Sequence, residues 1–144
     1  MTKTDEIEHL IPHSGRMCLL DRILRWDEDS IALATSSHRD TDNPLATARG
    51  LRAIHLCEYG AQAMAVHGGL TAMVHGAPIR PGMIVSLRNV ALGCDYANDL
   101  PGELRVEARR LHGSDAAWQY SFRVLHDVAV IAEGRATIAL QSGT

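Results

Sequence analysis

The sequence predicts an α+β protein in which one long helix packs against a curved antiparallel sheet. Two short strand-like segments come first, one long and nearly apolar helix follows, and four strand-like segments at hairpin spacing complete the chain. A helix with so little polar surface is normally buried on most sides, as when a sheet wraps around it. The 144 residues suit one compact domain, which we expect to span 1–144.

The first two strands are predicted to form a hairpin. Residues 18–26 read as an extended run, residues 27–30 as a polar turn, and residues 31–37 alternate apolar with small side chains. Residues 38–50 carry Asp40, Asn43 and Gly50 and lack hydrophobic periodicity. We therefore expect a loop that crosses the surface, with His38 as a surface residue.

The helix is predicted over residues 51–68, where alanine is frequent. Its apolar stripe is expected to consist of Ile54, Cys57, Ala61 and Met64. Gly68 and Gly69 are expected to end it.

The last four strands are predicted over residues 83–94, 102–112, 116–126 and 128–140. The breaks at 98–102, 112–115 and 126–127 are plausible turns, so we expect the strands to pair in sequence. A curved antiparallel sheet around one long helix is the hotdog architecture, although the order of elements also fits other α+β folds.

Composition excludes several classes of function. The 14 Lys and Arg residues are dispersed among 17 Asp and Glu, which argues against a nucleic-acid partner. No apolar stretch approaches a membrane span or a signal peptide, so we expect a cytoplasmic protein. Cys18, Cys57 and Cys94 are too widely spaced for a zinc site or a disulfide framework, and we expect buried, reduced thiols. No metal site or other cofactor is predicted.

Two segments carry a resemblance to a known family. Residues 11–23 read Ile-Pro-His-Ser-Gly-Arg-Met-Cys-Leu-Leu-Asp-Arg-Ile, and residues 58–69 begin with Glu58 and place Gln62 four positions later. Together they resemble the hotdog 3-hydroxyacyl-acyl-carrier-protein dehydratases, in particular a divergent branch found with aryl-polyene and related biosynthesis. The resemblance implies a hydro-lyase acting on thioester-linked acyl chains in fatty-acid or aryl-polyene-type biosynthesis, with an acyl carrier protein as partner.

One segment departs from the family pattern. The usual dehydratases carry a catalytic His in a Gly-His-Phe-Pro-Gly loop ahead of the helix, whereas the corresponding residues 43–50 contain no His. Either another His has taken its place or catalysis is lost.

Dehydration requires a base for the proton next to the carbonyl and an acid for the departing hydroxyl. Glu58, an ionisable residue on an apolar helix, is the candidate carboxyl; the alternative is an exposed position at the helix edge or a structural ion pair with an arginine. His55, three residues earlier on the same helical face, is the candidate replacement for the loop His, with a core or interface role as the alternative. Both are predicted catalytic residues.

Two further residues are predicted to bind substrate. Gln62 lies one turn after Glu58 on the same face and would orient its carboxyl or contact substrate; a satisfied core amide is the alternative. His13, in the amino-terminal Pro-His motif, is expected to shape the mouth of the acyl tunnel. The carrier protein is acidic, so one arginine near that mouth is expected to receive its phosphopantetheine arm. The candidates are Arg16, Arg49, Arg52 and Arg80.

Three classes of function remain open. A dehydratase would use Glu58 with a His; a thioesterase would use a helix carboxylate to direct water; a non-catalytic subunit would pair with an active dehydratase. The missing loop His favours the subunit, and Glu58 with Gln62 favours the dehydratase. A homodimer, or a heterodimer with a related hotdog dehydratase, is expected because one small sheet leaves its edges open.

Overall fold

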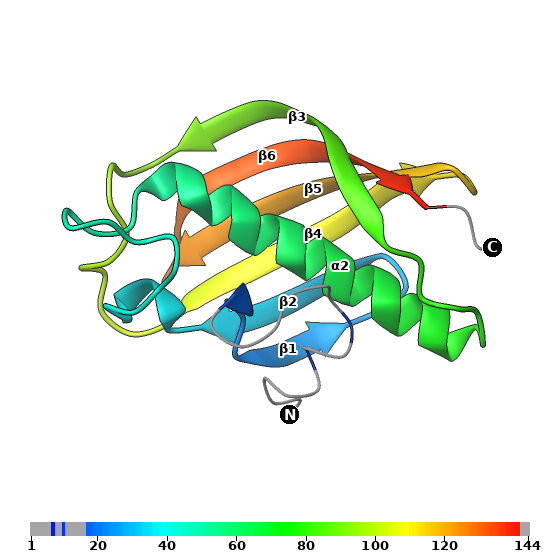
Figure 1. Ribbon diagram of the computed structural model, residues 1–144, viewed down its shortest axis with the longest axis horizontal. Coiled ribbons are helices and arrows are strands. Elements are labelled where there is room, and N and C mark those ends of the chain that lie inside the picture. The colour runs from blue at the N-terminus through cyan, green and yellow to red at the C-terminus, as the bar shows by residue number, and fades with distance from the viewer. Residues whose placement is uncertain (1–6, 8–9, 11–16, 142–144) are drawn as a thin grey trace.

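A computed structural model of the chain describes residues 7, 10 and 17–141. One long helix, α2 (Leu56–Val74), crosses one face of a six-stranded antiparallel sheet (Figure 1). The strands are β1 (Arg22–Trp26), β2 (Ser30–Thr35), β3 (Gly82–Leu92), β4 (Leu104–Gly113), β5 (Ala117–His126) and β6 (Ala129–Leu140). The α+β prediction is confirmed, and each predicted strand overlaps an observed one.

The order of strands across the sheet is β1-β2-β4-β5-β6-β3. The hairpin of β1 with β2 and the pairing of β4, β5 and β6 in sequence are confirmed. The predicted pairing of β3 with β4 is wrong, because β3 pairs with β6 at the edge and β4 pairs with β2. Residues 93–103 form no hairpin turn: they pass the start of the helix, where Arg52 bridges to Tyr96.

The helix begins and ends later than predicted. A 3-10 turn, η3 (Ala53–His55), precedes it, and α2 continues through Gly68 and Gly69 to Val74. Those glycines do not stop the helix; they let neighbours approach, since a Cβ at Gly68 would lie 3.1 Å from the Trp118 ring. The helix is terminated instead by Gly76, two residues after Val74, whose φ of +66° glycine adopts without strain.

The buried face of α2 differs from the predicted stripe. Leu56, Tyr59, Ala63 and Val66 are fully buried against the sheet. Of the predicted stripe, Met64 is buried, Cys57 and Ala61 are half-buried, and Ile54 is 46% exposed. The error arose because the helix is apolar on nearly all sides, so periodicity alone could not select the face that meets the sheet.

The helix approaches the centre of the sheet closely at Gly60. A Cβ at Gly60 would lie 2.5 Å from the ring of Phe122 on β5. Gly134 on β6 makes similar room, since its Cβ would lie 3.0 Å from the same ring. Phe122 is therefore held between two glycines, and this contact fixes how α2 lies over β5 and β6.

The loop between β2 and α2 is more buried than predicted. A 3-10 turn, η2 (Ser37–Arg39), begins it, and His38 is 1% exposed, so the prediction of a surface His38 is wrong. The hydroxyl of Tyr59 on α2 contacts Ser37 at 2.8 Å and accepts from Asn43 Nδ2 at 2.9 Å. These hydrogen bonds fold the loop over the start of the helix.

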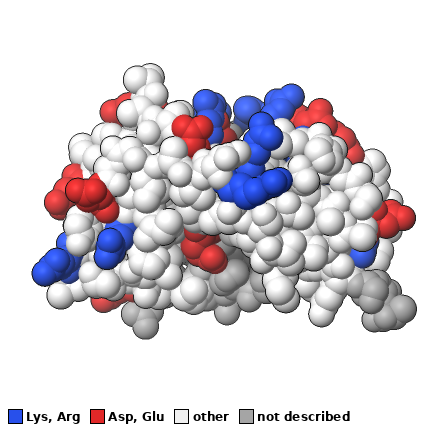
Figure 2. Space-filling model, turned by 90° about the horizontal axis from the view of Figure 1, so that it is seen from above, with Lys and Arg blue, Asp and Glu red and all other residues white. Residues whose placement is uncertain are grey.

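The two edges of the sheet are unequal. β1 is short, whereas β3 extends over eleven residues, nine of them exposed, and pairs on one side only. Its apolar side chains are unusually open, with Met83 69% and Val85 58% exposed. Seen from the β3 side, the middle of the surface is largely uncharged, and basic and acidic side chains lie together along one border (Figure 2). Within the described residues, no helix is long and apolar enough to cross a membrane.

Candidate active site

A cavity of about 680 Å³ lies along one face of α2. The helix contributes residues that recur every three or four positions, as one helical face does. These residues are Glu58, Ala61, Gln62, Ala65, Gly68, Gly69 and Ala72. The opposite wall comes from β3 and the segment before it and from β5 and β6, including Ile79, Ile84, Trp118 and Ile138. Small side chains on the helix leave the space, and the walls are mostly apolar.

Glu58 and Gln62 form a polar pair in this cavity. Gln62 Nε2 donates to Glu58 Oε1 at 3.4 Å and to the carbonyl of Met17 at 2.7 Å. Its Oε1 accepts from the backbone N–H of Leu19 at 2.9 Å. The amide is 1% exposed and both of its ends are engaged, so it orients the half-buried Glu58 carboxyl and fixes residues 17–19.

The structure brings Glu58 and Gln62 together and leaves His55 apart from them. His55 ends the 3-10 turn before α2, is half-buried, and does not line the cavity. His13 lies outside the described residues. The catalytic roles of Glu58 and His55 and the substrate-binding roles of Gln62 and His13 stay predictions.

Other histidines near the helix have structural partners. His38 Nε2 contacts the carbonyl of Leu100 at 2.9 Å, while its Nδ1 is buried without a hydrogen-bond partner among the described residues. Burial lowers the pKa of His38, so the neutral ring is favoured. His75 Nε2 lies 2.6 Å from Glu28 Oε1 at the exposed end of the helix.

The far end of the cavity holds a polar cluster that the sequence analysis missed. Arg110 of β4 lies over the ring of Trp118, with its Cζ 3.7 Å from the ring centroid. It also donates to the hydroxyls of Tyr120 and Thr71. One signal was available: strand alternation places Arg110 on the same face as the buried Ala108, toward the helix.

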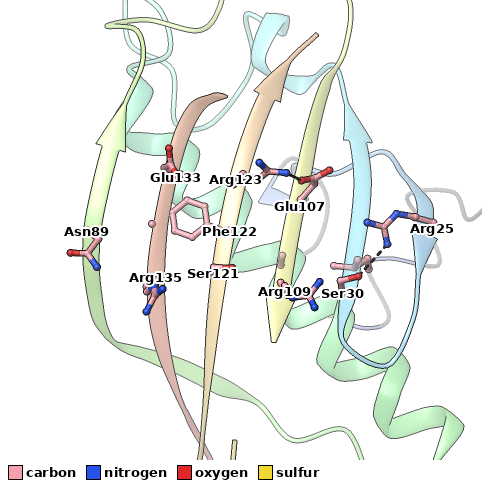
Figure 3. Close-up of a pocket in the computed structure, with 13 residues that line it drawn as sticks. Arg25, Ser30, Asn89, Glu107, Arg109, Ser121, Phe122, Arg123, Glu133 and Arg135 are labelled. Atoms are coloured by element: carbon pink, nitrogen blue, oxygen red, sulfur yellow. Dashed lines mark hydrogen bonds and ion pairs between the residues drawn. The ribbon is translucent and has the colours of Figure 1, made fainter. Parts of the chain in front are cut away.

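A second hollow, of about 450 Å³, lies on the other face of the sheet. Figure 3 shows this outer face with α2 behind it and polar side chains projecting from the strands, from Arg25 on β1 to Asn89 on β3. Glu107 is held there by Arg105 and Arg123, at 2.7 Å each. These charges lie across the sheet from Glu58, so this hollow is separate from the candidate active site.

Of the arginines expected to meet a carrier protein, Arg49 and Arg52 are exposed and Arg16 lies outside the described residues. Arg80 lines the cavity, but its guanidinium already donates hydrogen bonds to the backbone carbonyls of Gln141 at 2.7 Å and Asp115 at 2.9 Å. The three cysteines are free; Cys18 is buried, and the other two are half-buried rather than buried as predicted. No three His, Cys, Asp or Glu side chains between residues 17 and 141 gather in a way that could hold a metal ion.

The helix packed against the six-stranded antiparallel sheet defines a protein of the hotdog fold, as predicted. The chain belongs to the ApeP-like family, described as ApeP dehydratase, whose model matches residues 5–142. The predicted kinship with hotdog dehydratases is therefore confirmed. No protein in the search of curated sequences matches this chain.

Solved structures share the fold. The dehydratase heterocomplex ApeI:P from Xenorhabdus doucetiae is 18% identical, with a TM-score of 0.85 over 99% of this chain and 93% of that chain. The PaaI protein of the phenylacetic acid degradation operon of E. coli is 11% identical, with a TM-score of 0.64 over 94% and 88%. A hypothetical thioesterase with coenzyme A from Streptococcus pneumoniae is 9% identical, with a TM-score of 0.62 over 84% and 85%.

Proposed function

We propose that this protein dehydrates 3-hydroxyacyl thioesters carried by an acyl carrier protein, with Glu58 as the acid–base carboxyl. The observation that carries the proposal is the position of Glu58: it lies in a largely apolar cavity and is oriented by the buried amide of Gln62. Membership in the ApeP-like dehydratase family supports the same reaction. The expected compartment is the cytoplasm, where carrier-bound acyl chains would be elongated.

The reaction needs a proton to leave C2 and the C3 hydroxyl to leave as water. The C2–H bond electrons form the C2=C3 double bond as the C3–O bond breaks, and one proton is delivered to the departing oxygen. Glu58 can protonate the hydroxyl, and a neutral His can accept the C2 proton. His55 remains our candidate for that base, reaching the site across an assembled interface or from its own chain.

The open edge at β3 supports assembly with a second hotdog chain. A long strand with unpaired backbone groups and exposed apolar side chains is normally covered in the working protein. We infer that β3 pairs with the equivalent strand of an identical chain or of a related dehydratase. The latter arrangement is supported by the similarity to a heterocomplex in which dehydratase chains assemble.

The test is dehydration of a 3-hydroxyacyl pantetheine thioester by the purified chain, alone and with its hotdog partner, followed by the absorbance of the 2-enoyl thioester. We expect Glu58→Gln to lower kcat about 100-fold or more, because the amide cannot exchange a proton. Glu133→Gln, on the outer face of the sheet, is the matched control and should keep wild-type activity.

Three outcomes separate the candidate functions. Equal activity of Glu58→Gln and wild type would overturn the role of Glu58. Release of free thiol without the enoyl product would identify a thioesterase instead. No turnover by the folded chain alone, and turnover with a partner that is unaffected by Glu58→Gln, would identify a non-catalytic subunit.

A further inference from the structure

The polar cluster at the far end of the cavity has a cation with no anion to neutralise it. Arg110 lines the same cavity as Glu58, and its partners are the hydroxyls of Tyr120 and Thr71 and the rings of Trp118 and Tyr120. Within residues 17–141 no carboxylate forms an ion pair with it. The Glu28 carboxylate is hydrogen-bonded to His75 at 2.6 Å rather than to Arg110; that bond lowers the pKa of Glu28, and the positive charge of Arg110 adds to the effect. A half-buried cation beside apolar walls favours a hydrogen-bond acceptor from outside the chain.

The polar groups behind Arg110, those of Tyr120 and His67, already have hydrogen-bond partners within the protein. The carbonyl of Asp27 can only accept, so His67 Nε2 carries the hydrogen in that 2.9 Å bond and Nδ1 accepts from the Tyr120 hydroxyl at 2.7 Å. The Tyr120 oxygen in turn accepts from Arg110 Nε at 3.3 Å and Nη2 at 3.2 Å. Hydrogen bonds therefore link the Asp27 carbonyl, His67, Tyr120 and Arg110 in that order, and the guanidinium is the outermost group.

Arg110 keeps donors for a ligand. A guanidinium carries five N–H groups. Nε and Nη2 serve Tyr120 and Thr71, the latter at 3.1 Å, whereas Nη1 has no bond to any part of the chain that the structure describes. Trp118 holds the guanidinium plane from one face, which fixes the direction of the remaining donors.

We propose that this end of the cavity, formed by Arg110 with Trp118, Tyr120 and Thr71, binds an oxygen-bearing group at the far end of the acyl chain. Arg110 Nη1 would donate to that oxygen, while the apolar walls hold the chain between it and Glu58. The proposal deepens the proposed function, since it names the class of substrate: acyl thioesters whose distal end carries a hydroxyl or carboxylate rather than a methyl group.

The length of the cavity sets a minimum length for such a chain. Thr71 follows Glu58 by thirteen residues on α2, a rise of about 20 Å at ~1.5 Å per residue. An extended hydrocarbon chain zigzags and advances about 1.3 Å per carbon–carbon bond, so a chain that reaches from Glu58 to Arg110 needs about fifteen bonds. Short acyl groups should not reach the cluster and should show no preference for a distal oxygen.

The test compares ligands that differ only at the far end. Acyl pantetheine amides, which cannot be hydrolysed, would be prepared with chains of about eighteen carbons ending in methyl, hydroxyl or carboxylate. Binding to the full chain would be measured by calorimetry, so the readout does not depend on turnover. We expect the oxygen-ended ligands to bind about tenfold more tightly or better than the methyl-ended one.

Two substitutions on neighbouring positions of β4 isolate the contact. Arg110→Met should remove the preference, whereas Arg109→Met, on the outer face of the sheet, should keep it. Equal binding of all three ligands by the wild type would overturn the proposal even if Arg110→Met failed to fold. A preference that survives in a folded Arg110→Met protein would also overturn it.

The same ligands separate this proposal from the proposed function. Selective binding without dehydration of any 3-hydroxyacyl thioester would leave the distal site standing and remove the dehydratase. Dehydration together with equal binding of methyl-ended and oxygen-ended chains would support the dehydratase and overturn the distal site. Failure of all three ligands to bind would overturn the distal site.

Discussion

His67 shows how a buried ionisable residue becomes a structural one. It is fully buried, both ring nitrogens are bonded, and its ring packs edge-on against Tyr120 at 5.6 Å between centroids. Burial lowers the pKa of His67 below its usual value of 6.5, and the bond to the Asp27 carbonyl opposes this only in part. The neutral ring is the form that can accept from Tyr120, so the polar chain to Arg110 depends on its not being protonated.

Stability should consequently fall in mild acid. Below about pH 6.5 the unfolded chain takes up a proton on His67 that the folded chain does not, so unfolding becomes easier as pH falls from 6.5 toward the lowered folded pKa. The check is an NMR titration of the His67 ring alongside urea unfolding at several pH values. A ring that titrates at or above pH 6.5 in the folded protein would contradict this prediction, and His67→Gln assigns the resonance.

At the same scale, the sequence revealed part of the site and concealed the rest. Glu58 and Gln62 stand out because a carboxyl and an amide four residues apart on an apolar helix must share a face. Arg110 did not stand out, because it follows Arg109 in a strand with several charged residues, and only its alternation with the buried Ala108 indicates that it faces the helix.

Among the elements, α2 shows which boundaries sequence can predict. Its existence followed from a long apolar run rich in alanine, but two consecutive glycines were misread as its end. The end is a Schellman motif at Gly76: Ala77 N–H bonds the Ala72 carbonyl at 2.9 Å, and Gly76 N–H bonds the Met73 carbonyl at 3.1 Å. Glycines within a helix indicate close packing as readily as termination, and only the surrounding structure separates the two.

Substitution at Gly76 should measure the cost of this ending. A Cβ at Gly76 would meet no atom within 4 Å, so Gly76→Ala tests backbone strain alone, at a φ of +66°. We expect a loss of about 1 kcal/mol in the free energy of unfolding, measured in urea. Gly76→Asn is the matched variant and should lose less, because asparagine tolerates this region better. Equal stability of Gly76→Ala and wild type would contradict the motif's role.

In the whole molecule, the strand order leaves the long β3 at an open edge. The sequence predicted that edges would be open, but it placed β3 beside β4, because spacing cannot distinguish a hairpin from a crossover connection. The observed order exposes Met83, Val85 and Leu87 together on β3. This is the surface through which we expect the protein to assemble.

Charges placed on that edge should prevent assembly. Met83→Lys combined with Val85→Lys is expected to shift the mass measured by light scattering after size exclusion from that of a pair to that of one chain, because lysines block strand pairing. Val128→Lys adds the same charge at a side chain that is 94% exposed in the β5–β6 turn, and should leave the mass unchanged. A pair that survives the double substitution would place the interface elsewhere.

The location of the open edge also links assembly to substrate selection. Gly82 and Ile84 belong both to β3 and to the wall of the cavity that holds Glu58 and Arg110. A partner chain that changes the twist of β3 therefore changes the width of the space offered to the acyl chain. By thermodynamic reciprocity, an acyl chain bound in the cavity must then change the affinity of the protein for that partner by the same factor. The choice of partner would thus act as a filter on which acyl chains are processed.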